Sequence, residues 1–234
     1  MPHTSKSIAY TGEKKLISDM WCENYINKLD DTQKEEMIMG RQIVNQVKER
    51  LQKEKTVIIQ PFGRGVQHVD NSFIDNTGRS IEYKDFKALI KKLQEQDFAV
   101  ISMAEMGFDF SKDKLPFDVA MPEQVSLRHW TAAIKFANHF IGCDSVGQHL
   151  AYIMDTPSTV ICGPTFPVNI SYPECEYFNI VDLGMKDRVY DPIRIMPDET
   201  TSRHNENLMQ MNDDIVDYVV DRVLGKPIPE DNDE

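Results

Sequence analysis

Apolar and polar positions follow two different rhythms along this chain. Short runs that are apolar at nearly every position are separated by longer stretches with apolar residues every three or four positions. The first rhythm is typical of strands buried on both faces, and the second is typical of amphipathic helices. The pattern predicts strands at 56–60, 98–102, 117–120, 139–143, 158–162 and 178–181.

Helices are predicted around and between these strands, at 31–53, 83–94, 126–138, 145–154 and 213–224. Ser126 is a candidate N-cap, and a further short amphipathic helix is predicted between Leu16 and Ile26. Strands that alternate with helices indicate an α/β fold, Rossmann-like and doubly wound, with a mostly parallel sheet. We expect a helical arm at residues 1–55, the Rossmann-like domain at 56–224 and an acidic tail at 225–234.

Composition narrows the class of partner. The 234 residues carry a formal net charge of -12, which repels a phosphate backbone and argues against nucleic acid. No apolar run reaches the ~20 residues of a membrane helix, and the first residues lack the layout of a secretory signal. The 4 cysteines form no CxxC pair, which favours reduced core thiols over a disulfide or zinc site. A cytoplasmic protein without a metal is therefore expected.

Ligands of an open parallel sheet collect at the carboxyl ends of its strands, and the loops there hold the candidate chemistry. The loop after the first predicted strand contains Gly63 and Arg64, which suit an anion because glycine lets backbone amides approach and arginine pairs with phosphate. A surface turn with an incidental arginine is the alternative. The loop after the 158–162 strand holds Thr165, whose hydroxyl and amide lie at the same edge.

The loop after the 139–143 strand is the most informative. Asp144 and Ser145 lead into a predicted helix, whose amino terminus carries partial positive charge and suits a diphosphate. Helix capping by these two residues is the structural alternative. His149 lies one turn into the helix, where it is expected to face the ligand, although a helical histidine is more often structural.

Together these segments resemble a known family. The run FIGCDSVGQHLA at 140–151, followed by TPSTVICGPT at 156–165, is similar to the signature of the heptosyltransferase-type glycosyltransferases: an apolar strand, D-S-G-x-x-H-L-A, a short helix, then P-T-apolar-G-P-T. Residues 79–86 and the predicted 126–138 helix also resemble that family. The resemblance covers about residues 56–224 and is strongest at 141–165.

The resemblance implies one half of a GT-B enzyme, in which two Rossmann-like domains face each other. The second domain of that family holds an ADP-sugar or similar nucleoside-diphosphate sugar and transfers the sugar without a metal or other cofactor. It also implies contacts with the donor's diphosphate and sugar from Asp144, Ser145, Gly147 and His149, a phosphate contact from Arg79 in place of the usual lysine, and hydroxyl contacts from Glu105.

The sequence departs from the family pattern at two places that affect how a donor would be held and which donor would be preferred. Val146 stands where the family has glycine, with Gly147 one place later, and Ile81 stands where tryptophan is usual. Residues 1–55 are too few for the family's first domain, which supplies the acceptor site and the general base. The sequence therefore predicts a donor-binding domain with no assigned catalytic residue and a glycan or lipid-linked acceptor. We expect either a fragment of a longer protein or a first half supplied by a partner chain, and a homo-oligomer is a further alternative. A non-catalytic nucleotide-sugar binding module and a sugar-nucleotide epimerase remain alternatives.

Overall fold

A parallel sheet of six strands lies at the centre of the protein. This computed structural model describes residues 15–19, 24–27, 34–63, 66–69, 72–75, 77–104, 108–113, 117–188 and 207–227. The strand order is β10-β9-β8-β3-β6-β7. The strands are β3 (Lys55–Gln60), β6 (Phe98–Ser102), β7 (Val119–Ala120), β8 (His139–Gly142), β9 (Ser158–Cys162) and β10 (Phe178–Asp182). The predicted strands and their parallel pairing are confirmed.

The order of the strands places a topological switch point between β3 and β8. From β3 the chain moves outward to β6 and β7, and it then returns to β8 on the other side of β3. In the pairing of these two strands, Gln60 lies opposite Gly142. The connections that leave the two strands diverge, so a crevice is expected at their carboxyl ends, where open α/β sheets bind ligands.

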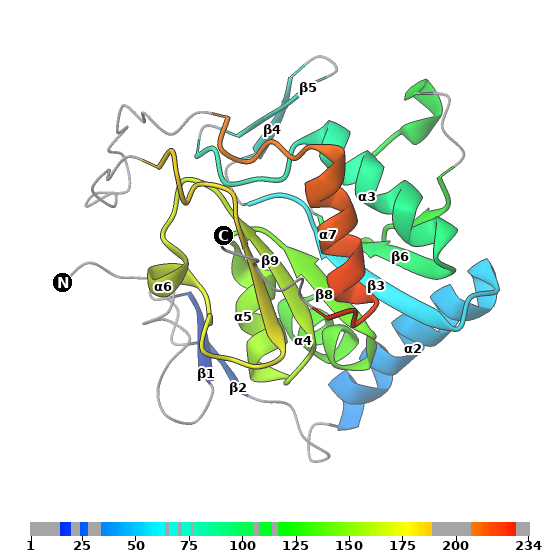
Figure 1. The fold of residues 1–234 in the computed structure, drawn as a ribbon. Coiled ribbons are helices and arrows are strands. Elements are labelled where there is room, and N and C mark those ends of the chain that lie inside the picture. Colours follow the sequence, from blue (N-terminus) through cyan, green and yellow to red (C-terminus); the bar gives the residue numbers. More distant parts are fainter. Residues whose placement is uncertain are drawn as a thin grey trace.

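Helices cover both faces of the sheet (Figure 1). They are α2 (Lys34–Leu51), α3 (Tyr83–Glu95), α4 (Leu127–Phe136), α5 (Val146–Ile153), α6 (Pro167–Ile170) and α7 (Asp213–Val223), with a short 3-10 helix at Phe110–Asp113. Helices α3 and α7 share one apolar cluster with Val57 and Ile59 of β3. Helices α2, α4 and α5 share the other cluster with Ile58. Burial on both faces is why the strands are apolar at successive positions.

Helix α4 confirms the predicted N-cap. The side chain of Ser126 accepts a hydrogen bond from the His129 amide at 3.2 Å. Helix α2 packs on α4 so closely that a Cβ at Gly40 would lie 2.5 Å from the Ala132 backbone. Because α2 contributes Val44 and other core residues to the same cluster as α4, it packs as part of this layer. The division of the chain at residue 55 stays a prediction.

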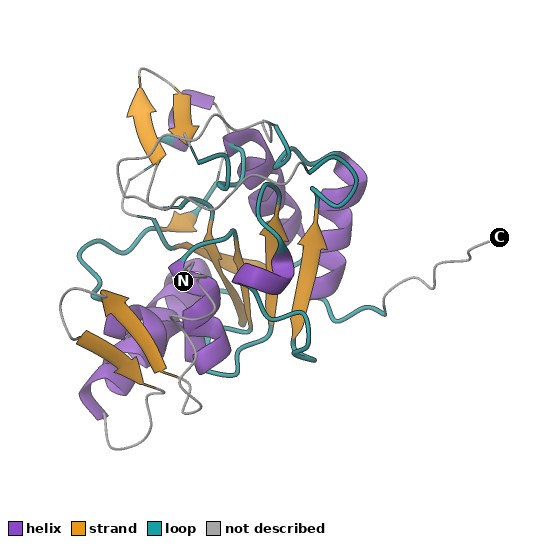
Figure 2. Cartoon of the chain, turned by 90° about the vertical axis from the view of Figure 1, so that its left-hand side faces the viewer, coloured by secondary structure: helices purple, strands orange, loops and turns teal. Residues whose placement is uncertain are grey.

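Two small antiparallel ribbons lie outside the central sheet (Figure 2). The first joins β1 (Lys15–Asp19) to β2 (Asn24–Asn27), so the helix predicted between Leu16 and Ile26 is wrong. In the backbone register Leu16 lies opposite Ile26 and Ile17 opposite Tyr25, and isoleucine and tyrosine are residue types that favour strands. The second ribbon, β4 (Val66–Val69) with β5 (Ser72–Asp75), occupies a stretch for which the pattern predicted no element.

Other sequence expectations concern thiols and membranes. Cys143, Cys162 and Cys175 are free thiols, and Cys22 lies outside the described residues. Burial raises the pKa of Cys143 to about 12, so this thiol stays protonated in the core. Within the described part of the chain, the helices are too short or too polar to cross a bilayer.

Candidate functional site

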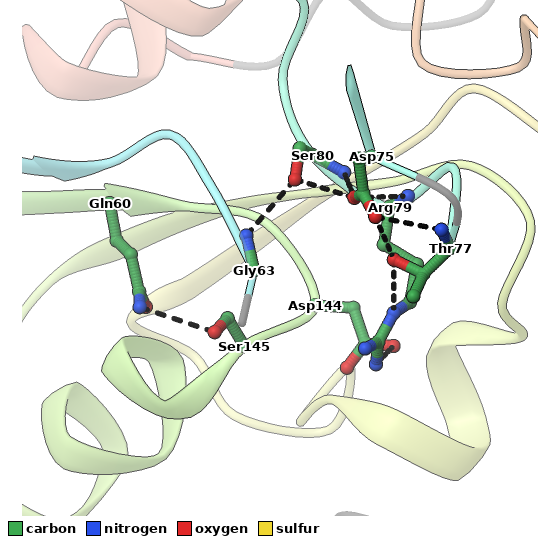
Figure 3. Close-up of polar contacts among 8 residues, drawn as sticks. All are labelled: Gln60, Gly63, Asp75, Thr77, Arg79, Ser80, Asp144 and Ser145. Carbon is green, nitrogen blue, oxygen red and sulfur yellow. Dashed lines mark hydrogen bonds and ion pairs between the residues drawn. The ribbon is translucent and has the colours of Figure 1, made fainter. Parts of the chain in front are cut away.

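Three polar loops meet at the switch point, at the carboxyl ends of β3 and β8 (Figure 3). They are the end of β3 with residues 60–63, the turn at 75–80 that follows β5, and the step from β8 into α5 at 143–145. The sequence predicted ligand residues in each of these segments, and the structure brings the segments together.

The Asp75 carboxylate organises the 75–80 turn. Its Oδ2 accepts hydrogen bonds from the Ser80 amide at 2.9 Å, the Ser80 hydroxyl at 2.6 Å and the Arg79 amide at 3.1 Å. Its Oδ1 accepts from the Thr77 amide at 2.7 Å. Burial on its own raises the pKa of Asp75, but the hydrogen bonds from Ser80 and Thr77 lower it below its ordinary value. The carboxylate therefore stays charged and fixes the backbone that carries Arg79.

The Ser80 hydroxyl also holds the loop after β3. It accepts a hydrogen bond from the Gly63 amide at 3.0 Å, and the Ile81 amide donates to the Pro61 carbonyl at 2.8 Å. The amide of Gly63, predicted to approach an anion, is therefore already paired within the protein. Arg64 and Glu105, the other residues predicted for this part of the site, lie outside the described residues.

Arg79 reaches from the turn to the start of α5. Its Nη1 lies 3.2 Å from Oδ2 of Asp144, and its Nε donates to the Thr77 hydroxyl at 3.2 Å. The side chain of Arg79 is 28% exposed, whereas that of Asp144 is 3% exposed. Burial on its own lowers the pKa of Arg79, but the charge of Asp144 and its hydrogen bond raise the pKa overall. A guanidinium has five N–H donors, so its exposed side keeps donors for an anion.

Gln60 links β3 to the first turn of α5. Its Oε1 accepts from the Gly147 amide at 2.7 Å, and its Nε2 donates to the Ser145 hydroxyl at 3.2 Å. A Cβ at Gly147 would lie 2.5 Å from both Gln60 Oε1 and the Phe140 ring. Glycine at 147 is therefore required for close contact with the sheet. The Gly147 amide hydrogen is directed to Gln60, and the predicted contact of Gly147 with a diphosphate stays a prediction.

His149, predicted to contact the donor, is enclosed in the protein. The residue is 4% exposed, and its Nδ1 lies 2.8 Å from the Tyr172 hydroxyl. Tyr172 in turn stacks on Tyr152, with ring centroids 3.7 Å apart. Burial lowers the pKa of His149 to about 4, although the charge of Asp144 opposes the shift. The ring is therefore neutral at pH 7 and belongs to a packed aromatic cluster, and its predicted contact with the donor stays a prediction.

A second arginine lies at the ends of β9 and β10. Arg188 pairs with Asp182, donates from Nε to the Gly163 carbonyl at 2.7 Å, and lies 4.8 Å from the centroid of the Phe166 ring. These contacts fix the loop that contains Thr165. The Thr165 hydroxyl is buried and has no hydrogen-bond partner among the described residues.

Sequence reasoning missed three residues that build the site: Gln60, Asp75 and Ser80. Two of them carry a sequence signal. Gln60 directly follows the apolar run Val57 to Ile59, and Asp75 begins the sequence D-N-T-G, which is typical of a turn closed by an aspartate side chain. Arg188 has no comparable sequence signal, because two of its partners, Gly163 and Phe166, lie in the loop after β9. Within the described segments, no three His, Cys, Asp or Glu side chains gather as metal ligands.

Two solved structures share this architecture. One is Escherichia coli ADP-heptose LPS heptosyltransferase II, with 10% identity over 92% of this chain and 58% of that chain and a TM-score of 0.52. The other is a family 9 glycosyl transferase from Veillonella parvula, with 10% identity over 82% of this chain and 52% of that chain and a TM-score of 0.58. This chain has the heptosyltransferase fold.

The predicted heptosyltransferase resemblance is thus confirmed for the fold. The chain spans little more than half the length of either heptosyltransferase-fold structure. No family model matches the sequence, and no curated protein matches it.

Proposed function

We propose that the protein binds a nucleoside-diphosphate sugar at the switch point between β3 and β8 and serves as the donor domain of a metal-independent glycosyltransferase. The observation that carries this proposal is the partly exposed Arg79, which is held at the carboxyl edge of a parallel sheet by the buried Asp144. A cation fixed beside the start of a helix suits a diphosphate, because the helix amino terminus adds partial positive charge.

The proposed chemistry is displacement at the anomeric carbon of the sugar, with the nucleoside diphosphate as leaving group. Negative charge grows on the diphosphate as the glycosidic bond breaks. Arg79 and the Ser145 hydroxyl are placed to receive that charge, and donors fixed beforehand stabilise it without reorganisation. Because both are tied to neighbours in the fold, neither needs to be ordered when the donor binds.

The identity of the donor is part of the proposal. One neighbour is named as an ADP-heptose transferase, so an ADP-linked sugar is the first candidate. Calorimetry should compare ADP, UDP and GDP and their sugars, with and without EDTA. Binding of one nucleoside diphosphate, unchanged by EDTA, would support the proposal. Absence of binding by every member of this panel would overturn it.

A second candidate function is a nucleotide-sugar binding module that does not catalyse transfer. One observation favours it: the described titratable groups of the site are engaged within the protein. Asp144 pairs with Arg79, and His149 is buried and neutral. Hydrolysis or transfer of the bound donor distinguishes the two functions, because the binding module would bind the donor without turnover. The same transfer assay, repeated with candidate glycan or lipid-linked acceptors and with candidate partner chains, would identify the acceptor and the partner.

A further inference from the structure

The Gln60 side chain forms a bridge whose hydrogen-bond direction can be assigned. Its Oε1 lies 2.7 Å from the Gly147 amide nitrogen, and its Nε2 lies 3.2 Å from the Ser145 hydroxyl oxygen. A backbone amide can only donate, so the oxygen of the Gln60 amide must face Gly147. The Gln60 nitrogen consequently faces Ser145 and donates to it.

This direction determines what the Ser145 hydroxyl can do. A serine hydroxyl has one proton and two lone pairs, and one lone pair receives the hydrogen from Gln60. Ser145 is the N-cap residue of α5, yet its side chain makes no capping hydrogen bond. Gln60 takes over this task by accepting from Gly147. The Ser145 hydroxyl proton thus remains for another acceptor.

The packing at Gly147 makes the bridge specific. Gln60 is 7% exposed, so its amide has little access to water. A Cβ at residue 147 would lie 2.5 Å from Gln60 Oε1, and any residue other than glycine would displace the bridge. This fit explains why residue 147 is glycine.

We infer that Gln60 is a positioning residue that orients the Ser145 hydroxyl as a donor to a phosphate oxygen of the bound sugar nucleotide. The inference rests on the proposed function. The hydrogen bonds form one chain, from the Gly147 amide to Gln60, from Gln60 to Ser145, and from Ser145 to the phosphate. Consecutive hydrogen bonds polarise one another, so the last donor in the chain is strengthened. The ligand group at this point must be an acceptor, which suits a diphosphate.

A double-mutant cycle tests whether Gln60 acts through Ser145. Gln60→Met keeps the length of the side chain but removes both hydrogen bonds, and Ser145→Ala removes the donor. Each single variant should weaken ADP binding about tenfold, the lower end for a hydrogen bond to a charged group. The double variant should also lose about tenfold, because both changes remove the same interaction. Gln94→Met, at the far end of α3, removes a hydrogen bond to the Asp118 carbonyl and should leave ADP affinity unchanged.

The outcomes separate the role of Gln60 from the proposed function. Multiplicative losses in the double variant, about a hundredfold, would assign Gln60 an independent structural effect and overturn the inference. Unchanged ADP affinity in Gln60→Met would also overturn it, with ADP binding by the natural chain still intact. No ADP binding by the natural chain would overturn the ADP form of the proposed function and the inference with it.

A second variant covers the case in which Gln60→Met does not fold. Gln60→Glu retains an acceptor for the Gly147 amide, but its carboxylate accepts the Ser145 proton and places a negative charge beside the phosphate. ADP binding should fall more than tenfold while the thermal midpoint of Gln60→Glu shows a folded protein. A folded Gln60→Glu protein that binds ADP as well as the natural chain would overturn the inference.

Discussion

Two arginines at the carboxyl edge of the sheet each pair with an aspartate, yet their surroundings differ. The Arg79 side chain is 28% exposed and its partner Asp144 is 3% exposed. Arg188 reverses this arrangement, because the arginine is 4% exposed and its partner Asp182 is 23% exposed. In one pair the cation faces outward and the anion is covered, and in the other the cation is enclosed. The comparison indicates that an arginine–aspartate pair leaves part of the cation at the surface at Arg79 and holds loops together at Arg188.

The largest effect should come from the enclosed arginine. Arg188→Ala removes the partner of Asp182, the donor to the Gly163 carbonyl and the contact with the Phe166 ring. Breaking a buried ion pair costs about 3–5 kcal/mol, and the exposure of Asp182 favours the lower value. Urea unfolding measures the change. A loss below about 1 kcal/mol would contradict a structural role for Arg188.

His149 sharpens the comparison, because it shares α5 with the open site but is enclosed like Arg188. Burial lowers its pKa from 6.5 to about 4, so the unfolded chain binds a proton first as the pH falls. Stability is therefore full above pH 6.5 and is lost as the pH falls toward 4, by about 3 kcal/mol for this residue.

His149→Gln keeps a partner for the Tyr172 hydroxyl and removes this titration. Unfolding free energies measured between pH 4 and 7 should fall less steeply for the variant than for the natural chain. His139, whose pKa burial also lowers to about 4, titrates in both proteins and cancels in the difference. Equal slopes would mean that His149 is accessible and protonated in the folded protein.

Arg79→Ala is expected to act on binding more than on folding. Removal of a charge-assisted contact should weaken donor binding by about 1.5–3 kcal/mol, measured by calorimetry. Arg128→Ala is the matched control, since Arg128 pairs with Glu36 at 2.9 Å between α4 and α2. The affinity of the Arg128→Ala protein for the donor should equal that of the natural chain. If the natural chain and Arg79→Ala bind the donor with equal affinity, Arg79 does not contact the donor.

The smallest effect is expected at Ser80, which ties the open site to its scaffold. Ser80→Ala removes the acceptor of the Gly63 amide and one donor to Asp75. The loss of stability should be about 1 kcal/mol, with donor affinity falling less than in Arg79→Ala. Thermal unfolding and calorimetry measure the two values. A larger loss of affinity than in Arg79→Ala would indicate that the loop, and not the cation, dominates binding.

The sequence predicted the sheet better than the site for a physical reason. Runs such as Val57 to Ile59 are apolar because both faces of the sheet are covered, so local composition indicates strand and burial together. The helix predicted between Leu16 and Ile26 is wrong because, over so short a segment, six apolar residues fit the periodicity of a helix as well as that of a strand.

The site depends on pairings between distant residues, which no local pattern carries. Gln60 meets Gly147, and Arg79 meets Asp144, across 87 and 65 residues of chain. Motif resemblance predicted Asp144, Ser145 and Arg79 in one region, and the structure brings them together at the switch point. The resemblance did not predict that the Gly63 amide donates to the Ser80 hydroxyl or that the Gly147 amide donates to Gln60 Oε1.

The central claim is that a nucleoside diphosphate binds at the switch point beside Arg79 and Ser145. Titration of ADP into isotope-labelled protein, followed by amide chemical shifts, tests this claim most directly. The predicted result is that the largest shifts map to residues 60–63, 77–80 and 144–147, and that they disappear in Arg79→Ala. Shifts centred on the loop enclosed by Arg188, or no saturable shifts, would contradict it.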